Sequence, residues 1–380
     1  MHHQFYLLTL LFISLTTCSG QPSSSSTDEM KGEIVITDAI LGQLIMCGFR
    51  GMSYDSLSPL IKEQITSGEI GNIILFDYDV GHKTYERNVR SPEQVMQFLK
   101  DLQANSPTPL FTAVDQEGGK VNRLKERYGF TALPSAQYLG SQATTDSTAY
   151  YAVFNSESLY ALGFNVNFAP VVDLNVNPDN PVIGKIERSF GTSSEQVIAH
   201  ARAWIQAHEE MGILSVLKHF PGHGSSEADS HKGFTDVTNS WSEAELVPYQ
   251  ELLKDEAGLA VMTAHVFNRN IDSLYPATLS PHYIQTILRD SSQYDGLVFS
   301  DDLQMNAVSK LYDFKTIIRQ SFLAGVDVLV FGNNLENYNE NIAREAIKCI
   351  RELLAEGSLT QERLLESYER VQLAKARQIN

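Results

Sequence analysis

The chain has 380 residues, of which 43% are hydrophobic and 20% are charged, a composition typical of a soluble globular protein. Its formal net charge of −17 at pH 7 would repel phosphate backbones, so we expect no nucleic-acid partner. Length alone allows one large domain or two ordinary ones.

The N-terminus carries an apolar run over residues 5–15 that is too short to span a bilayer and is typical of the core of a secretory signal. The motif LTTC follows and resembles a bacterial lipoprotein signal, with Cys18 as the lipidated residue; the alternative is a plain signal peptide cleaved nearby. We predict a signal peptide over residues 1–17 and a Ser-rich flexible tether over 18–33. The protein would then be exported, to the periplasm or outer membrane, and attached to the membrane by a lipid anchor at Cys18.

The other two cysteines, Cys47 and Cys349, lie in apolar, periodic segments. We predict that both are buried free thiols, because such cysteines behave as small hydrophobic residues. The sequence contains no disulfide framework and no paired cysteine motif for a metal.

From about residue 34 the chain alternates short apolar runs with helical patterns. We predict strands at 42–49, 71–76, 109–115, 164–170, 214–219, 259–265, 296–301 and 326–332. We predict helices at 91–106, 148–162, 193–212, 242–254, 280–288 and 314–324, followed by two closing helices. About eight β/α units indicate a (β/α)₈ TIM-type barrel over residues 34–380, a single domain that we expect to be monomeric.

Polar residues stand at or just past the carboxyl ends of five predicted strands. They are Asp115, Asp173, the pair Lys218 and His219, His265, and Asp301. In a barrel these strand ends share one face, where the loops build the active site. The sequence therefore predicts an active site at that mouth.

The stretch KHFPGHGSSEADSH, residues 218–231, allows two kinds of site. A loop could gather His219, His223, Asp229 and His231 around zinc, but the proline and glycines disfavour the helix that the His219–His223 spacing would need. A proton-transfer site explains more. Asp229 lies two residues before His231, close enough to hold one imidazole nitrogen and fix its tautomer. An Asx-type turn at Asp229 is the structural alternative.

Two further motifs place carboxylates at strand ends. In VFSDDLQM, Asp301 directly ends the strand and should point into the barrel mouth, whereas Asp302 should cap a turn or face solvent. In VDQEGGKVNRL, Asp115 can accept hydrogen bonds from adjacent sugar hydroxyls, and Arg123 can donate a fork to an acyl or carboxyl oxygen. Glu117 in the same motif could equally be a surface residue.

Together these motifs resemble glycoside hydrolase family 3, specifically its single-domain β-N-acetylhexosaminidase branch. The resemblance rests on KHFPGHGSSEADSH, VDQEGGKVNRL, NFAPVVDLN, ERSFG and FSDDLQM, which occur in the family's order from about residue 41 to about residue 332. It implies a barrel and a retaining mechanism. We expect no cofactor and no metal. It implies that Asp301 is the nucleophile and that Asp229 and His231 form the acid/base dyad. It further implies that the sugar is bound by Asp115, Arg123, Arg188, Lys218 and His219.

The function that we expect from this resemblance is an exo-acting β-N-acetylglucosaminidase acting on oligosaccharides or muropeptides derived from chitin or peptidoglycan. Two alternatives stay open. A phosphorylase of the same family would use phosphate in place of water, which a histidine acid/base would tolerate. A surface lipoprotein that binds sugar without turnover is the alternative from another class.

Overall fold

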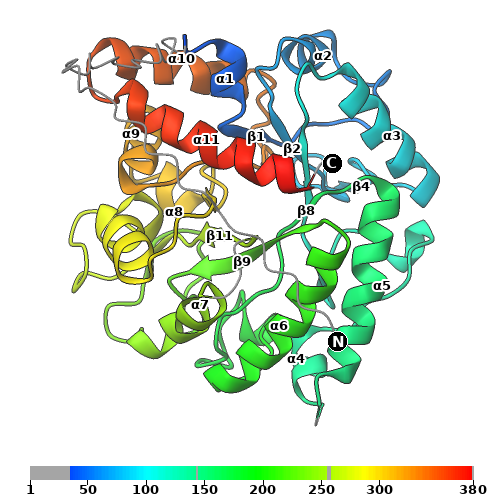
Figure 1. Ribbon diagram of the computed structural model, residues 1–380, viewed down its shortest axis with the longest axis vertical. Helices are drawn as coiled ribbons and strands as arrows, with labels where there is room; N and C mark the ends of the chain where they lie inside the picture. Colours follow the sequence, from blue (N-terminus) through cyan, green and yellow to red (C-terminus); the bar gives the residue numbers. More distant parts are fainter. Residues whose placement is uncertain (1–34, 143, 255–257, 379–380) are drawn as a thin grey trace, which may run out of the picture. The chain divides into compact units, whose positions relative to one another are not determined.

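Eight parallel strands form a barrel at the centre of the protein (Figure 1), in a computed structural model that describes residues 35–142, 144–254 and 258–378. They are β1 (Ile45–Cys47), β2 (Asn72–Ile74), β5 (Phe111–Val114), β8 (Val166–Asn167), β9 (Leu214–Phe220), β11 (Ala260–Thr263), β13 (Val298–Phe299) and β14 (Leu329–Phe331). The sheet runs in the order β13-β11-β9-β8-β5-β2-β1-β14, and a parallel bridge between Phe299 and Val328 joins its two edges. All eight strands lie within or overlap the predicted runs, and the predicted (β/α)₈ fold is confirmed.

Helices surround the strands in chain order, as the colours of Figure 1 show. They are α1 (Asp38–Gly42), α2 (Pro59–Thr66), α3 (Pro92–Asn105), α4 (Ala136–Gly140), α5 (Asp146–Leu162), α6 (Ser194–Glu210), α7 (Val247–Leu252), α8 (Asn306–Ser309), α9 (Phe314–Ala324), α10 (Ile342–Ala355) and α11 (Gln361–Gln378). None of the helices in the described ranges combines the length and the apolar character that crossing a membrane requires. Residues from Ile36 onward form one compact unit.

Local sequence signals explain where the predicted helices begin and end. Ser91 caps α3 by accepting a hydrogen bond from the Gln94 N–H, and Pro92 occupies the first turn, where its missing N–H costs nothing. Asp313 caps α9 in the same way, and that helix ends at Gly325 with φ of +113°.

Other local elements differ from the prediction. Residues His282–Ser291 form a π-helix rather than an α-helix. The predicted helix at 242–254 is divided into a 3₁₀ helix, η3 (Glu243–Leu246), and the short α7. Three small two-stranded sheets in the described ranges were not predicted. They pair β3 (Tyr78–Asp79) with β4 (Thr84–Tyr85), β6 (Gln116–Gly118) with β7 (Val121–Asn122), and β10 (Thr235–Asp236) with β12 (Val266–Phe267).

The two cysteines of the barrel are buried free thiols, as predicted. Burial raises the pKa of Cys47 to about 12 and that of Cys349 to about 11, so neither is a reactive thiolate at neutral pH. The predicted signal peptide, the tether and Cys18 lie outside the described residues.

Candidate active site

The carboxyl ends of the strands open into a cavity of about 550 Å³. Its lining includes every barrel residue predicted to act on or bind a substrate except Asp229. These are Asp115, Arg123, Arg188, Lys218, His219, His231 and Asp301. Residues that are up to 186 positions apart in the chain, Asp115 and Asp301 among them, therefore meet at one mouth because parallel strands present their carboxyl ends together.

Lys218 is the cation at the base of this cavity. It is only 2% exposed, and its Nζ lies 2.8 Å from Asp115 Oδ1 and 2.6 Å from Glu117 Oε1. Arg123 Nη2 donates to the other oxygen of Asp115 at 3.0 Å. Burial alone would raise the pKa of Asp115, but Lys218 and Arg123 hold it below its usual value. Asp115 therefore stays ionised and can accept hydrogen bonds.

Glu117 is buried, so the suggestion that it could be a surface residue is wrong. Its two oxygens accept a fork from Arg188, with both N···O distances at 2.8 Å. Sequence reasoning gave Glu117 no role. The signal that could have found it is its spacing from Asp115, since residues two apart in an extended segment share one face, and β6 (Gln116–Gly118) directly follows β5.

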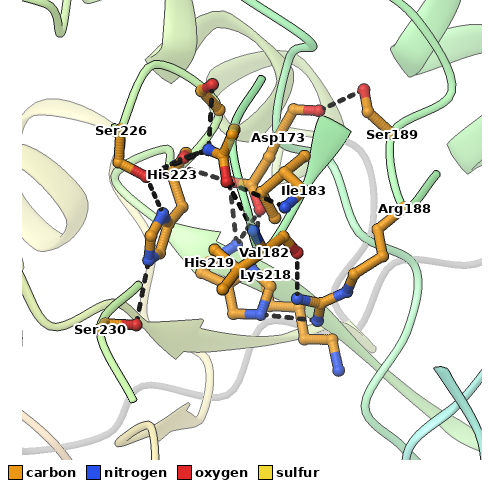
Figure 2. A network of polar contacts seen from close by, with 12 residues as sticks. Asp173, Val182, Ile183, Arg188, Ser189, Lys218, His219, His223, Ser226 and Ser230 are labelled. Carbon is orange, nitrogen blue, oxygen red and sulfur yellow. Dashed lines mark hydrogen bonds and ion pairs between the residues drawn. The ribbon is translucent and has the colours of Figure 1, made fainter. Parts of the chain in front are cut away.

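His219 is oriented from two sides (Figure 2). Its Nδ1 lies 2.7 Å from Asp173 Oδ2, and its Nε2 lies 3.0 Å from Arg188 Nη2. Because arginine can only donate, Nε2 must accept, and the ring proton therefore sits on Nδ1 and is donated to Asp173. The predicted strand-end position of Asp173 is confirmed, but its job of fixing the His219 ring was not foreseen.

Asp173 is fully buried and binds the backbone as well as the ring. It accepts the N–H of His219 at 3.2 Å and the N–H of His223 at 2.8 Å. Burial would raise its pKa, but His219 and the N–H of His223 keep the pKa of Asp173 below the usual value.

Asp229 and His231 form the predicted pair. Asp229 Oδ1 lies 3.0 Å from His231 Nδ1 and accepts the His231 backbone N–H at 2.9 Å. Burial raises the pKa of Asp229, but the N–H and the ring of His231 bring it below its usual value. An ionised carboxylate only accepts, so Nδ1 carries a proton and Nε2 is the nitrogen left to exchange protons. The His231 side chain is 66% exposed, at the open side of the cavity.

Asp301 lies at the end of β13 and lines the cavity, as predicted. Burial alone would raise its pKa, but His265, His219 and His231 lower it, so that the pKa of Asp301 lies below its usual value. Its Oδ1 accepts the N–H of Asp302 at 2.8 Å. The carboxylate is thus ionised and faces the same cavity as His231.

Asp302 caps a turn by accepting the Gln304 N–H at 3.0 Å, which was one of the two expectations for it. The other expectation, that it faces solvent, is wrong because Asp302 is half-buried and lines the cavity. Burial raises the pKa of Asp302 to about 6, whereas the pKa of its neighbour Asp301 lies below the usual value. The buried His265 contacts this turn, with its Nε2 3.0 Å from the Asp302 carbonyl oxygen.

His223 is packed inside the loop that carries the pair and does not line the cavity. Its Nδ1 lies 2.6 Å from Ser226 Oγ and its Nε2 3.2 Å from Ser230 Oγ (Figure 2). Burial lowers the pKa of His223 to about 4, so the ring is neutral. Within the part of the chain that the structure describes, no group of three or more His, Cys, Asp or Glu side chains is arranged to hold a metal ion. The zinc alternative thus lacks a ligand set there.

At the mouth of the (β/α)₈ barrel, the carboxylates and the carboxylate-held histidine are groups of the kind that nucleophilic and acid–base cleavage of a glycosidic bond requires. The chain belongs to glycosyl hydrolase family 3: the model of the "Glycosyl hydrolase family 3 N terminal domain" matches residues 36–374.

Named relatives and solved structures agree with this assignment. The chain is 31% identical to the Beta-hexosaminidase A of Pseudoalteromonas piscicida, over 90% of this chain and 61% of that protein. It is 35% identical to the Beta-hexosaminidase of Alkalilimnicola ehrlichii, over 78% of this chain and 82% of that protein. It superposes with a TM-score of 0.81 and 32% identity on a family 3 beta-N-acetylglucosaminidase from Paenibacillus sp. str. FPU-7, over 91% of this chain and 63% of that one. This chain therefore spans less than two thirds of the first and third of these proteins.

Proposed function

We propose that the protein is an exo-acting, retaining β-N-acetylglucosaminidase that removes terminal N-acetylhexosamine from peptidoglycan- or chitin-type fragments. The observation that carries the proposal is that two different groups line one cavity. One is an ionised carboxylate, Asp301, and the other is the imidazole of His231, whose Nδ1 is held by Asp229. A carboxylate and a separate proton donor are the pair that double displacement at a sugar carbon needs. The names of the relatives and of the matching structure support the same sugar specificity.

In the first step, Asp301 attacks the anomeric carbon and the C–O bond to the leaving group breaks. Protonated His231 gives its Nε2 proton to the leaving oxygen, and a glycosyl ester of Asp301 forms. In the second step, neutral His231 takes a proton from water, which attacks the same carbon and releases Asp301 as a carboxylate. Asp229 stabilises the imidazolium of the first step and fixes the tautomer that the second step uses.

The sugar would be held at the closed side of the cavity. Asp115 offers ionised oxygens to adjacent hydroxyls, and Lys218 brings a positive charge to the same place. Arg188 and Arg123 are already oriented by Glu117 and Asp115, so little ordering is needed when an acetamido or hydroxyl oxygen arrives. His219 is fixed by Asp173 and Arg188.

Hydrolysis is favoured over phosphorolysis by the relatives, which are named hexosaminidases. Product analysis with and without inorganic phosphate checks this point: we expect free N-acetylglucosamine in both cases and no sugar phosphate.

Turnover of a chromogenic N-acetylglucosaminide tests the function itself. We expect wild type to release the chromophore and Asp301→Asn to lose essentially all kcat. Asp229→Ala should slow both chemical steps by about 100- to 10,000-fold, the range of general acid–base contributions, while still binding the sugar. A wild-type protein that binds N-acetylglucosamine but does not cleave its glycosides would instead support the sugar-binding lipoprotein. Unaltered turnover in Asp229→Ala would show that Asp229 and His231 do not act as the acid/base dyad.

We also propose that the enzyme is exported and anchored to a membrane by a lipid at Cys18, on the strength of the apolar run and the LTTC motif. Radiolabelled palmitate should enter wild type and not Cys18→Ala. If the label does not depend on Cys18, the anchor is wrong, and a plain signal peptide is the better interpretation.

A further inference from the structure

The segment 221–234, which we call the acid/base loop, follows β9 and carries Asp229 and His231. The first part of this loop is fastened to the barrel by side chains. Asp173 accepts the N–H of His223 at 2.8 Å, and Asn180 Nδ2 donates to the carbonyl oxygen of His223 at 2.7 Å. The position of the dyad thus depends on how the base of the loop is held.

Glu245, in η3, holds the base of the loop from another element. Its Oε2 accepts the N–H groups of Gly224 at 3.0 Å and Ser225 at 3.2 Å. The loop passes so close to Glu245 that a Cβ placed on Gly222, where φ is +115°, would lie 2.5 Å from the Cβ of Glu245. Trp241, just before η3, adds a bond from its Nε1 to the Pro221 carbonyl at 3.1 Å.

A carboxylate is a costly choice at this position. Glu245 is 1% exposed, no ion pair to it is found among the described residues, and its Oε1 is a buried atom without a hydrogen-bond partner there. The titratable groups that act on Glu245 or are acted on by it are Asp173 and Tyr249 of α7, and neither supplies a positive charge. Burial raises the pKa of Glu245 to about 7, and Asp173 adds to the rise.

A carboxyl group that is costly to bury is thus placed where it binds the base of the loop that carries Asp229 and His231. We propose that Glu245 is a positioning residue for leaving-group protonation. It fixes the base of the acid/base loop so that His231 reaches the glycosidic oxygen. Glu245 does not itself line the cavity, so it acts through the loop backbone. The inference rests on the proposed function, since it presupposes that His231 is the general acid.

The test compares two substrates that differ in their need for a proton. Dinitrophenolate leaves without protonation, whereas the sugar alcohol released from chitobiose must be protonated. In Glu245→Met, which keeps a similar volume but removes the acceptor of both N–H groups, we expect kcat/KM for chitobiose to fall by about 10- to 100-fold, the cost of a misplaced catalytic group. kcat/KM for the dinitrophenyl N-acetylglucosaminide should stay near the wild-type value. kcat on this second substrate should fall, because hydrolysis of the glycosyl ester needs His231 as a base. Azide attacks the glycosyl ester without a base, so it should restore kcat and yield the glycosyl azide.

Asp272→Leu is the matched control, because it removes an acceptor of the same kind. Asp272 is also a buried carboxylate that accepts two loop N–H groups, those of Leu274 at 2.8 Å and Tyr275 at 3.0 Å, but that loop carries no residue of the proposed dyad. Any loss in this variant should be equal for both substrates. Glu245→Asp, which retains the carboxyl group but shortens its reach, serves as the second variant if Glu245→Met does not fold.

Equal losses on both substrates in the Glu245 variants, or no loss on either, would overturn the inference. His231→Ala separates that failure from a failure of the proposed function. If His231→Ala loses more kcat/KM on chitobiose than on the dinitrophenyl substrate and the Glu245 variants do not, only the positioning role of Glu245 is wrong. If His231→Ala lacks this difference as well, the assignment of His231 is wrong.

Discussion

Two buried lysines lie at opposite ends of the barrel, and they are held in different ways. Lys218, 2% exposed, sits at the mouth between the carboxylates of Asp115 and Glu117. Lys375, 4% exposed, reaches from α11 to the amino ends of β1, β2 and β5. Its Nζ donates to Gln43 Oε1 at 2.7 Å and to the carbonyl oxygens of Gly71 at 2.9 Å and Pro109 at 2.6 Å.

The difference lies in the charge of the partners. Lys218 is compensated by two anions, which keeps those anions ionised and leaves a polarised surface that a sugar can bind. Lys375 has only neutral oxygens, and burial lowers its pKa well below the usual value. Three hydrogen bonds from one side chain join three strands, so this lysine closes the bottom of the barrel. The two lysines thus show two ways of burying a cation, one with anions at the mouth and one with neutral oxygens at the amino end.

The largest effect should come from Lys218→Met. It leaves Asp115 with Arg123 and Glu117 with Arg188 as their remaining cations, so we expect a loss at the lower end of the about 3–5 kcal/mol of unfolding free energy that breaking a buried ion pair costs. The same change takes a proposed sugar contact from the closed side of the cavity. We therefore expect kcat/KM on the chromogenic substrate to fall by about 1,000-fold or more, since a lost charged contact is worth several kcal/mol. A variant that is destabilised but retains its kcat/KM would show that the mouth charges are structural.

Glu245 extends the comparison to a buried carboxyl group near the mouth that has no cation beside it among the described residues. The pKa of a glutamate in an unfolded chain is about 4.3, whereas that of Glu245 is raised to about 7. The folded protein therefore binds this proton more tightly, and stability is lost as pH rises through that window. Relative to Glu245→Gln, wild type should lose about 2–3 kcal/mol of unfolding free energy between pH 5 and pH 8. Urea unfolding of both proteins at the two pH values measures the difference, and parallel curves would mean that the carboxyl is not titrating there.

The smallest effect should come from Lys375→Met. Three buried oxygens lose their donor, which costs about 1–3 kcal/mol, partly offset because a buried amine no longer has to be accommodated. The kcat and KM of the folded fraction should equal those of wild type. A change in kcat without a change in the unfolding midpoint would contradict the purely structural role that we assign to Lys375.

The fold could be predicted because parallel barrel strands are buried on both faces and therefore appear as continuous apolar runs. Capped helices such as α3 and α9 were predictable for a similarly local reason, since Ser91 and Asp313 stand at their first turns. The pairing of Asp229 with His231 followed from a spacing of two residues.

What the sequence did not reveal depends on contacts between distant segments. The sequence left open whether Glu117 is a surface residue, because its partners, Arg188 and Lys218, lie 71 and 101 positions further along the chain. The roles of Asp173 and Glu245 are hidden for the same reason, since both bind the base of the acid/base loop from other elements. The strands of the small sheets were also hidden, since strands such as β3 and β4 have two residues each and are too short for a periodic pattern.

The roles assigned to Asp301 and His231 can be tested on the covalent intermediate. In His231→Ala the second step should be slow, so a dinitrophenyl N-acetylglucosaminide should load the enzyme faster than water unloads it. Mass spectrometry of the acid-quenched, digested protein should then find one N-acetylhexosamine residue on the peptide that contains Asp301, and none on Asp301→Asn. A sugar attached to a different peptide, or rapid turnover with no adduct at any time, would contradict the proposed mechanism.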